Sequence, residues 1–124
     1  MSDLHVSWTD YHQKIEQLAA RVSQSGWEFD QIVCIARGGL RVGDTLARIF
    51  SRPLAILSTS SYHGAGKQNR SSLVFSRDLS MTTPGLGSRV LLVDDLVDSG
   101  ESLKRSLKWL DCYYGFYIDE IRTA

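Results

Sequence analysis

The feature that most constrains this chain is a short apolar run that ends abruptly in acidic and small residues. Val90–Val93 consists of four apolar β-formers, which is typical of a buried strand, and Asp94 and Asp95 follow it directly. Residues 98–102, Asp-Ser-Gly-Glu-Ser, then lead into a region with helical spacing. In open parallel α/β sheets, ligands bind beyond the carboxyl ends of the strands. The stretch therefore predicts a parallel α/β sheet with a binding site at this strand end.

The residue types after this strand indicate a phosphorylated sugar as the ligand. The carboxylates of Asp94 and Asp95 can accept hydrogen bonds from sugar hydroxyls, and glycine with small hydroxyl residues lets a phosphate approach the backbone. A helix that starts after Ser99 attracts a phosphate through its free N–H groups and dipole. Because two carboxylates facing a phosphate repel it, Mg²⁺ is the expected companion, held by Asp94 and Asp95 directly or through water.

Other sites also contain an apolar strand that ends in two acids. They include the Walker B segment of nucleotide-binding proteins, the acidic pocket of receiver domains and ordinary solvated strand ends. A Walker A motif needs Gly, four residues, then Gly-Lys-Ser/Thr, but Gly66-Lys67 has Ser61 at the first position and Gln68 at the last. A receiver domain places its acid pair after the first strand, whereas here the pair comes late. The rest of the chain therefore favours the phosphosugar interpretation.

Residues 90–100 resemble the phosphoribosyl-pyrophosphate (PRPP) signature of the type I phosphoribosyltransferases. That signature has four apolar residues, two acids, two apolar residues, then an acid, Thr or Ser, and Gly; Ser99 here keeps the hydroxyl of the commoner Thr. The resemblance extends from about Trp8 to Ile121 and points to the short bacterial xanthine/guanine (6-oxopurine) enzymes. It implies an α/β fold of the Rossmann-like kind, a mainly parallel twisted sheet flanked by helices.

The same resemblance implies an activity, partners and a cellular setting. The activity is that of a Mg²⁺-dependent pentosyltransferase of purine salvage, which transfers the 5-phosphoribosyl group from PRPP to guanine, xanthine or hypoxanthine and releases pyrophosphate. The implied partners are PRPP and a purine base, in a cytoplasmic homo-oligomer.

Each residue of the motif takes a role from this resemblance. Asp94 and Asp95 hold the ribose hydroxyls and Mg²⁺, and Asp98 lies by the imidazole edge of the base as general base or charge stabiliser. The residues that cradle the 5′-phosphate, mostly through backbone N–H groups, are Ser99, Gly100, Glu101 and Ser102.

A second candidate binding loop follows another apolar run. Residues 32–36 predict a central strand, and Arg37-Gly38-Gly39 follows it immediately. Two glycines beside an arginine let the backbone bend sharply and expose N–H groups next to a positive charge, which suits pyrophosphate. The alternative is a tight turn with a solvated Arg37. The loop resembles the pyrophosphate loop of the purine phosphoribosyltransferases, which implies that Arg37 and Gly38 receive pyrophosphate and that the Ala36–Arg37 peptide is cis.

Residues 63–72 form a polar, glycine-rich and basic segment. An ordinary surface loop is one interpretation. The other is a lid, because a reaction that competes with hydrolysis gains from excluding water, and a basic lid neutralises departing pyrophosphate. The segment resembles the family's flexible catalytic loop, which starts after a Ser-Tyr pair like Ser61-Tyr62. Lys67 and Arg70 are the candidates within it.

The remaining pattern alternates helices and strands. Apolar spacing from Tyr11 to Val22 predicts a helix with Thr9 or Asp10 as its N-cap, ended by Gly26. Further predictions are a helix over 40–49, strands over 54–62 and 73–76, a turn or linker over 81–87, and a helix after Ser99 through Leu110.

Several aromatic residues are better explained by structural packing than by a role in ligand binding or catalysis. Trp8, Trp27, Phe29 and Trp109 are assigned to structural packing, with Trp27 and Phe29 closing the core against the sheet, and the aromatic segment 113–118 is assigned to the core or an interface.

Composition narrows the classes of partner. The chain has 124 residues, 14 basic against 14 acidic, so nothing in its net charge favours nucleic acid or an anionic membrane. Cys34 and Cys112 form neither a metal-binding pair nor a disulfide framework, and both are interpreted as reduced thiols. No apolar run approaches a membrane span, and the N-terminal residues lack the pattern of a signal peptide.

The C-terminal part departs from the family pattern. The family has a further strand and a base-binding segment, with an aromatic residue to stack on the purine and a lysine for its exocyclic oxygen; neither is recognised beyond Ile121. We therefore expect a single phosphoribosyltransferase domain over residues 1–124 that lacks the C-terminal part of the hood. Alternatives are a PRPP- or nucleotide-binding regulatory module without turnover, and a truncated enzyme with an open sheet edge.

Overall fold

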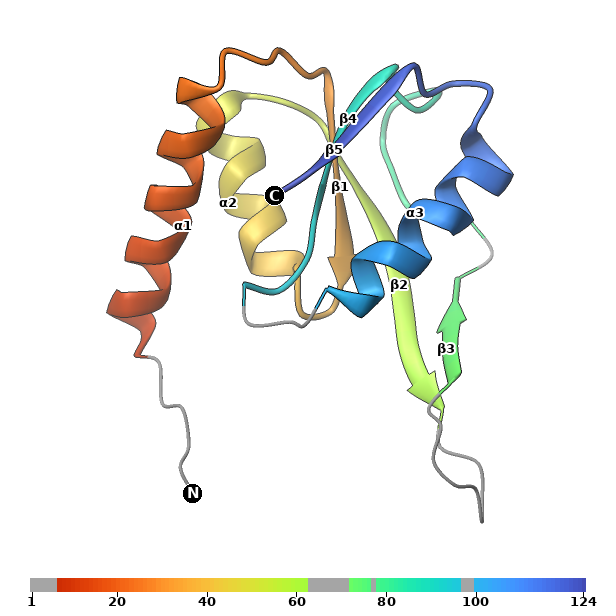
Figure 1. Ribbon diagram of the computed structural model, residues 1–124, viewed down its shortest axis with the longest axis horizontal. Helices are drawn as coiled ribbons and strands as arrows, with labels where there is room; N and C mark the ends of the chain where they lie inside the picture. Colours follow the sequence, from red (N-terminus) through yellow and green to blue (C-terminus); the bar gives the residue numbers. More distant parts are fainter. Residues whose placement is uncertain (1–6, 63–71, 77, 97–99) are drawn as a thin grey trace.

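The computed structural model describes residues 7–62, 72–76, 78–96 and 100–124 of the chain. They form a five-stranded sheet with helices on both faces (Figure 1). In chain order the elements are α1 (Trp8–Gln24), β1 (Gln31–Ala36), α2 (Leu40–Phe50), β2 (Leu54–Tyr62), β3 (Ser72–Phe75), β4 (Arg89–Val93), α3 (Glu101–Tyr114) and β5 (Glu120–Thr123).

The sheet is mainly parallel, as the sequence predicts. Its strand order is β3-β2-β1-β4-β5; β1, β2, β4 and β5 run parallel, and β3 pairs antiparallel with β2. The register places Cys34 of β1 opposite Val93 of β4. Because these neighbouring strands are parallel and end together, the segments that follow them leave the sheet side by side.

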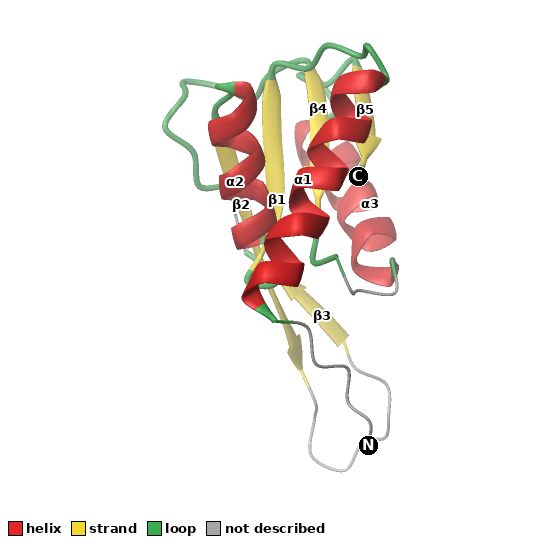
Figure 2. Ribbon diagram, turned by 90° about the vertical axis from the view of Figure 1, so that its left-hand side faces the viewer, coloured by secondary structure: helices red, strands yellow, loops and turns green. Residues whose placement is uncertain are grey.

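Helices cover the sheet on both faces (Figure 2), and alternation along β1 divides the core between them. Ile32 and Cys34 pack with the buried residues of α1 and α2. Val33 and Ile35 belong to the cluster on the other face, with Leu110 of α3 and residues of the segment between β3 and β4. All six residues of β1 are buried, which confirms the predicted central strand.

The first helix begins earlier than predicted. Ser7 is its N-cap, with Oγ accepting a hydrogen bond from the Asp10 N–H at 3.1 Å, so the assignment of Thr9 or Asp10 is wrong. A serine two residues further upstream satisfies the same free N–H groups. At the other end, α1 stops at Gln24, and Gly26 takes a φ of +72°, as expected for a residue that ends a helix.

The aromatic residues divide between the core and the surface. Phe29 is 6% exposed and Trp27 packs against the same cluster, which confirms both as packing residues, as does Trp109 in the other cluster. Trp8 is 65% exposed and packs at the surface, edge to face with Tyr11 of α1 and under Arg41 of α2.

The prediction that no further strand is formed near the end of the sequence is also wrong. β5 runs parallel to β4, with Ile121 opposite Val90. The sequence pattern of β5 is hard to recognise as a strand because β5 is short and carries two charged residues, Glu120 and Arg122. Glu120 accepts a hydrogen bond from Arg89 of β4 at 3.1 Å, so the charges support the strand pairing.

None of the helices in the described part of the chain combines the length and the apolarity that a membrane-spanning helix needs.

Candidate active site

Two loops that are far apart in sequence meet at the carboxyl ends of β1 and β4. A β-carbon built on Gly38 would lie 3.1 Å from Cβ of Asp95 and 3.2 Å from its Oδ2. A β-carbon on Gly39 would lie 2.9 Å from Cα of Asp94. At Gly39 only glycine allows this approach, since real β-carbon contacts are almost never this short, and at Gly38 a side chain would push Asp95 aside by a few tenths of an ångström. The structure thus brings the predicted pyrophosphate loop against the predicted ribose-binding acids.

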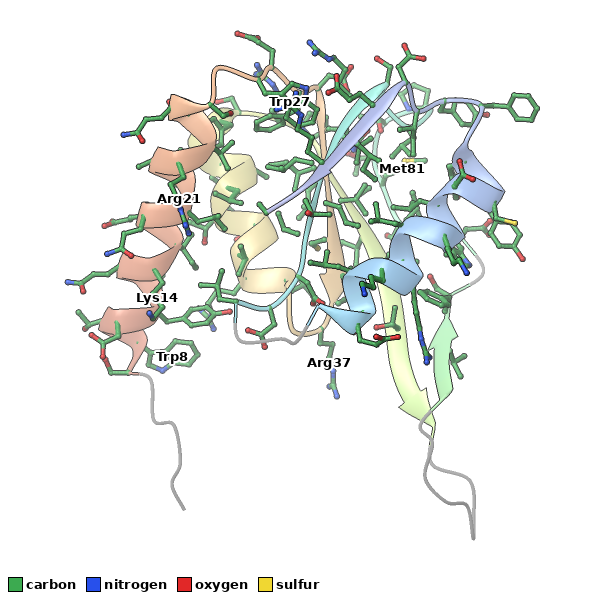
Figure 3. The ribbon with its side chains drawn as sticks, viewed as in Figure 1. Trp8, Lys14, Arg21, Trp27, Arg37 and Met81 are labelled. Carbon is green, nitrogen blue, oxygen red and sulfur yellow. The ribbon has the colours of Figure 1, made fainter. Side chains whose placement is uncertain are left out.

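The loop after β1 is a tight turn with an exposed arginine. The Ala36–Arg37 peptide is cis, as the family resemblance implies. The Gly39 N–H donates to the Ile35 carbonyl at 2.7 Å, and the Leu40 N–H donates to the Arg37 carbonyl at 3.1 Å. Figure 3 shows Arg37 extending from the end of β1 away from the sheet, on the side where α3 begins. The guanidinium is therefore exposed beside the N-terminus of α2, where an anion is favoured.

The two acids after β4 have different environments. Asp94 is 5% exposed, and its Oδ1 accepts a hydrogen bond from the Asp95 N–H at 2.7 Å. Asp95 is half-buried, and its Oδ1 accepts a hydrogen bond from the Tyr11 hydroxyl at 3.4 Å. Asp94 thus fixes the turn after the strand, while Asp95 presents the more accessible carboxylate to the site.

Sequence reasoning missed Tyr11 as a residue of the site. It lies 84 positions before Asp95 and was read only as an apolar position of a helix. No local pattern marks it, since the contact depends on where α1 crosses the sheet.

The third part of the site is the start of α3. Gly100 is its N-cap with a φ of +97°, and no side chain caps the helix. The N–H groups of the first turn, at Glu101 and Ser102, are those that the sequence assigns to the 5′-phosphate. Glu101 Oε2 accepts a hydrogen bond from Arg105 Nε at 3.2 Å, which draws its carboxylate back along the helix. This pairing offsets part of the repulsion between Glu101 and a bound phosphate.

Four of the predicted site residues lie outside the described residues: Asp98, Ser99, Lys67 and Arg70. Their roles stay predictions.

The two acids fit a metal ion that is shared with the substrate. Among the described residues, no three His, Cys, Asp or Glu side chains gather to hold a metal. Mg²⁺ keeps several waters and commonly binds one or two carboxylates together with substrate phosphates. The half-buried carboxylate of Asp95 beside an anion loop matches that donor set, with Asp94 behind it.

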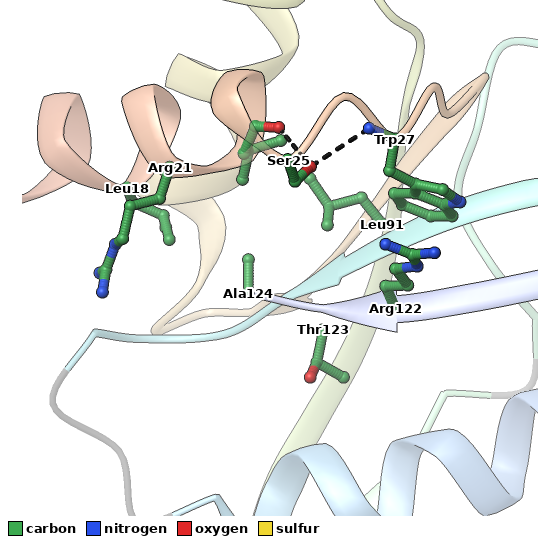
Figure 4. A pocket seen from close by; sticks show the side chains of 9 residues that line it. Leu18, Arg21, Ser25, Trp27, Leu91, Arg122, Thr123 and Ala124 are labelled. Carbon is green, nitrogen blue, oxygen red and sulfur yellow. Dashed lines mark hydrogen bonds between the residues drawn. The ribbon is translucent and has the colours of Figure 1, made fainter.

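A separate cavity of about 260 Å³ lies away from this site, between α1 and the edge formed by β4 and β5 (Figure 4). Leu18, Leu91 and Trp27 supply apolar surface, and Arg21 and Arg122 add positive charge. None of the predicted site residues lines it.

A parallel α/β sheet with a glycine-rich loop and an acidic loop facing each other at its strand ends has the arrangement in which open α/β sheets bind ligands. The family model described as "Phosphoribosyl transferase domain" matches residues 7–124, and the chain belongs to this family. The fold class and the resemblance predicted from the sequence are thus confirmed.

Individual relatives agree with this assignment. The chain is 37% identical over 108 residues to the xanthine-guanine phosphoribosyltransferase of Roseobacter denitrificans, a match that covers 81% of this chain and 60% of that protein. It is 34% identical over 107 residues to the protein of that name in Idiomarina loihiensis, covering 82% of this chain and 61% of that one. The chain thus spans about 60% of the length of these curated relatives.

Solved structures share the fold. The purine phosphoribosyltransferase of Pyrococcus horikoshii superposes with a TM-score of 0.75 at 24% identity, covering 99% of this chain and 75% of that one. The xanthine-guanine-hypoxanthine phosphoribosyltransferase of Helicobacter pylori gives a TM-score of 0.68 at 20% identity, covering 96% and 84%.

Proposed function

We propose that this chain binds PRPP with Mg²⁺ and belongs to an enzyme that transfers the phosphoribosyl group to a 6-oxopurine, guanine, xanthine or hypoxanthine, and releases pyrophosphate. The observation that carries the proposal is the approach of Gly38 to Asp95, because it joins an anion loop and a sugar-binding carboxylate in one site. The curated relatives are xanthine-guanine phosphoribosyltransferases, which supports this class of acceptor.

The geometry suits a reaction that needs positioning and charge stabilisation more than covalent help. As pyrophosphate leaves, positive charge develops on the ribose ring and negative charge on the leaving group. The exposed guanidinium of Arg37 and the N–H groups at the start of α2 face the leaving group, with Gly38 leaving room for it. Asp95, with Asp94 behind it, holds the ribose hydroxyls. Asp94 and Asp95 would hold Mg²⁺, which would supply positive charge to neutralise the phosphates.

The remaining roles complete the proposed mechanism. Residues 99–102 bind the 5′-phosphate, mostly through backbone N–H groups, and Asp98 takes or stabilises a proton on the imidazole edge of the base. Lys67 and Arg70 neutralise the charge of the departing pyrophosphate.

Calorimetry tests the proposal directly. PRPP with Mg²⁺ is titrated into the wild type, into Asp94→Asn and Asp95→Asn, and into the control Asp119→Asn. Asp119 is exposed and precedes β5, at the opposite ends of the parallel strands. We expect binding in the wild type and the control, and a loss of affinity in the two site variants.

Pyrophosphate release is then measured after addition of guanine, xanthine or hypoxanthine. Release with one of these bases supports the transferase and identifies its acceptor. Binding without release with any base contradicts the catalytic role and favours a PRPP-binding module. No binding of PRPP by the wild type contradicts the proposal as a whole.

The proposal includes a cytoplasmic location and a homo-oligomeric assembly. The two cysteines are free thiols, as expected in the reducing cytoplasm.

The residues Tyr113, Phe116 and Tyr117 are 64%, 103% and 54% exposed, and such an aromatic surface at the end of α3 favours self-association. Light scattering on the purified chain measures the mass; a monomer at every concentration would contradict the homo-oligomer.

A further inference from the structure

We infer that Tyr11 is a positioning residue for the PRPP site: its hydroxyl holds one oxygen of the Asp95 carboxylate so that the carboxylate is fixed over Gly38. The inference rests on the proposed function, because it assigns Tyr11 to the carboxylate that would bind the ribose.

The Asp95 carboxylate lies between two elements. On one side, Oδ1 accepts the Tyr11 hydroxyl at 3.4 Å. On the other, Oδ2 lies 3.2 Å from the position that a β-carbon on Gly38 would take. The hydrogen bond to Tyr11 is long for an O–H···O contact, as is common for active-site groups before a ligand binds. This hydrogen bond still restricts the rotation of the carboxylate and sets the direction of its lone pairs.

The ring of Tyr11 is itself held in place. It is half-buried and packs against the core cluster of α1 and α2. The ring of Trp8 meets it edge to face, with the centroids 6.2 Å apart and the planes at 89°. Arg41 of α2 lies over the Trp8 ring, with Cζ 4.1 Å from its centroid. These contacts join the start of α1 to the first turn of α2, so Tyr11 reaches Asp95 from a fixed support.

The hydroxyl of Tyr11 donates this hydrogen bond, and Oδ1 of Asp95 accepts it. A carboxylate that is already oriented loses less rotational freedom when a ribose hydroxyl binds it.

The position of Tyr11 predicts a selective effect on ligands. Asp95 is assigned to the ribose, whereas pyrophosphate is assigned to Arg37 and Gly38. Loss of the Tyr11 hydroxyl is therefore expected to weaken binding of PRPP and to leave binding of inorganic pyrophosphate unchanged. A general disturbance of the contact between α1 and α2 would weaken both ligands, since Gly39 and α2 carry the pyrophosphate loop.

The experiment compares Tyr11→Phe with wild type and with Tyr113→Phe, a matched removal of a hydroxyl from an exposed ring at the far end of α3. Each protein is titrated with PRPP and with pyrophosphate, both with Mg²⁺, and its thermal unfolding is recorded. We expect Tyr11→Phe to bind PRPP roughly threefold to tenfold more weakly, the net effect of one ordinary hydrogen bond, because the contact is long. Its pyrophosphate affinity and melting temperature should match the wild type, and Tyr113→Phe should match it throughout.

Three results would overturn the inference. Equal PRPP affinity in Tyr11→Phe and wild type would show that the hydroxyl does not position Asp95. An equal loss for PRPP and pyrophosphate, or the same loss in Tyr113→Phe, would assign the effect to packing. Both leave the proposed function intact. Failure of the wild type to bind PRPP would instead overturn the proposed function, and the role of Tyr11 with it.

Discussion

Gly39 and Asp94 lie backbone against backbone where β1 and β4 end. A β-carbon on Gly39 would come within 2.9 Å of Cα of Asp94 and within 2.8 Å of the Ile35 carbonyl oxygen. Backbone atoms in a central sheet cannot move aside cheaply, unlike the end of a flexible side chain. The second glycine of the Arg-Gly-Gly sequence is thus needed to bring the two binding loops together, and the first to leave space beside Asp95.

Gly39→Ala is expected to destabilise the chain and to weaken PRPP binding together. The added methyl group forces the loops apart at a cost of about 1–3 kcal/mol in the free energy of unfolding. Urea denaturation gives the stability, and calorimetry gives the affinity. Gly85→Ala is the control, because its β-carbon would meet only a ring carbon of Tyr117 at 3.9 Å. Unchanged stability in Gly39→Ala would show that the loops are not locked by this contact.

Arg37→Ala is expected to leave stability unchanged and to weaken pyrophosphate and PRPP binding by about tenfold, the value of one charge-assisted hydrogen bond at an exposed site. The side chain is exposed, so the fold loses little packing. Arg48→Ala removes an equivalent charge from the far end of α2, where Arg48 pairs with Asp44 at 3.1 Å, and should bind both ligands like the wild type. If Arg37→Ala bound pyrophosphate normally, the role assigned to Arg37 would be wrong.

The strand ends were predictable because they combine two local signals. Residues 32–36 and 90–93 are continuous apolar runs, and each is followed at once by glycine or acid. These signals predict the fold class and the position of each loop at a strand end. The structure adds that β1 and β4 are neighbours, and this pairing places Gly38 beside Asp95.

Other features depend on contacts that no local pattern encodes. Tyr11 reaches Asp95 because of the path that α1 takes across the sheet, which periodicity does not specify. Trp8 is exposed because it is the first residue of α1, and the buried residues of the helix start only at Ile15. β5 was missed because it is short and two of its residues are charged; Glu120 pairs with Arg89 of β4 and with Arg122.

Gln31→Leu is expected to lower the free energy of unfolding by about 1–3 kcal/mol, because it removes a buried polar side chain and leaves the Gly87 N–H without the acceptor that Gln31 supplies. Gln31 is 1% exposed; its Oε1 accepts the Gly87 N–H at 3.0 Å, and its Nε2 donates to the Pro53 carbonyl at 3.4 Å. It therefore joins the segments that precede β4 and β2 to the start of β1. Thermal or urea unfolding measures the change, with Gln17→Leu on the exposed face of α1 as the control. Equal losses in both variants would argue against this specific role.

The buried thiol of Cys34 predicts that stability falls in alkali. Burial raises the pKa of Cys34 to about 11, with smaller contributions of the same sign from Asp44 and Asp94. In the unfolded chain the thiol ionises near pH 8.5–9. Above that pH the unfolded state releases a proton that the folded state keeps, so unfolding becomes more favourable as the pH rises. The contribution is fully present below about pH 8.5 and is lost progressively as the pH approaches 11.

Replacement of Cys34 by alanine tests this assignment. The loss expected from the thiol is about 2–3 kcal/mol between pH 8 and 11, and Cys34→Ala should show a shallower fall over the same range, whatever its stability at pH 7. Cys112→Ala is the matched control, because Cys112 is exposed and its removal should leave the wild-type slope. Urea denaturation at several pH values gives the slopes directly. An identical slope in wild type and Cys34→Ala would mean that groups other than this thiol set the alkaline limit of the fold.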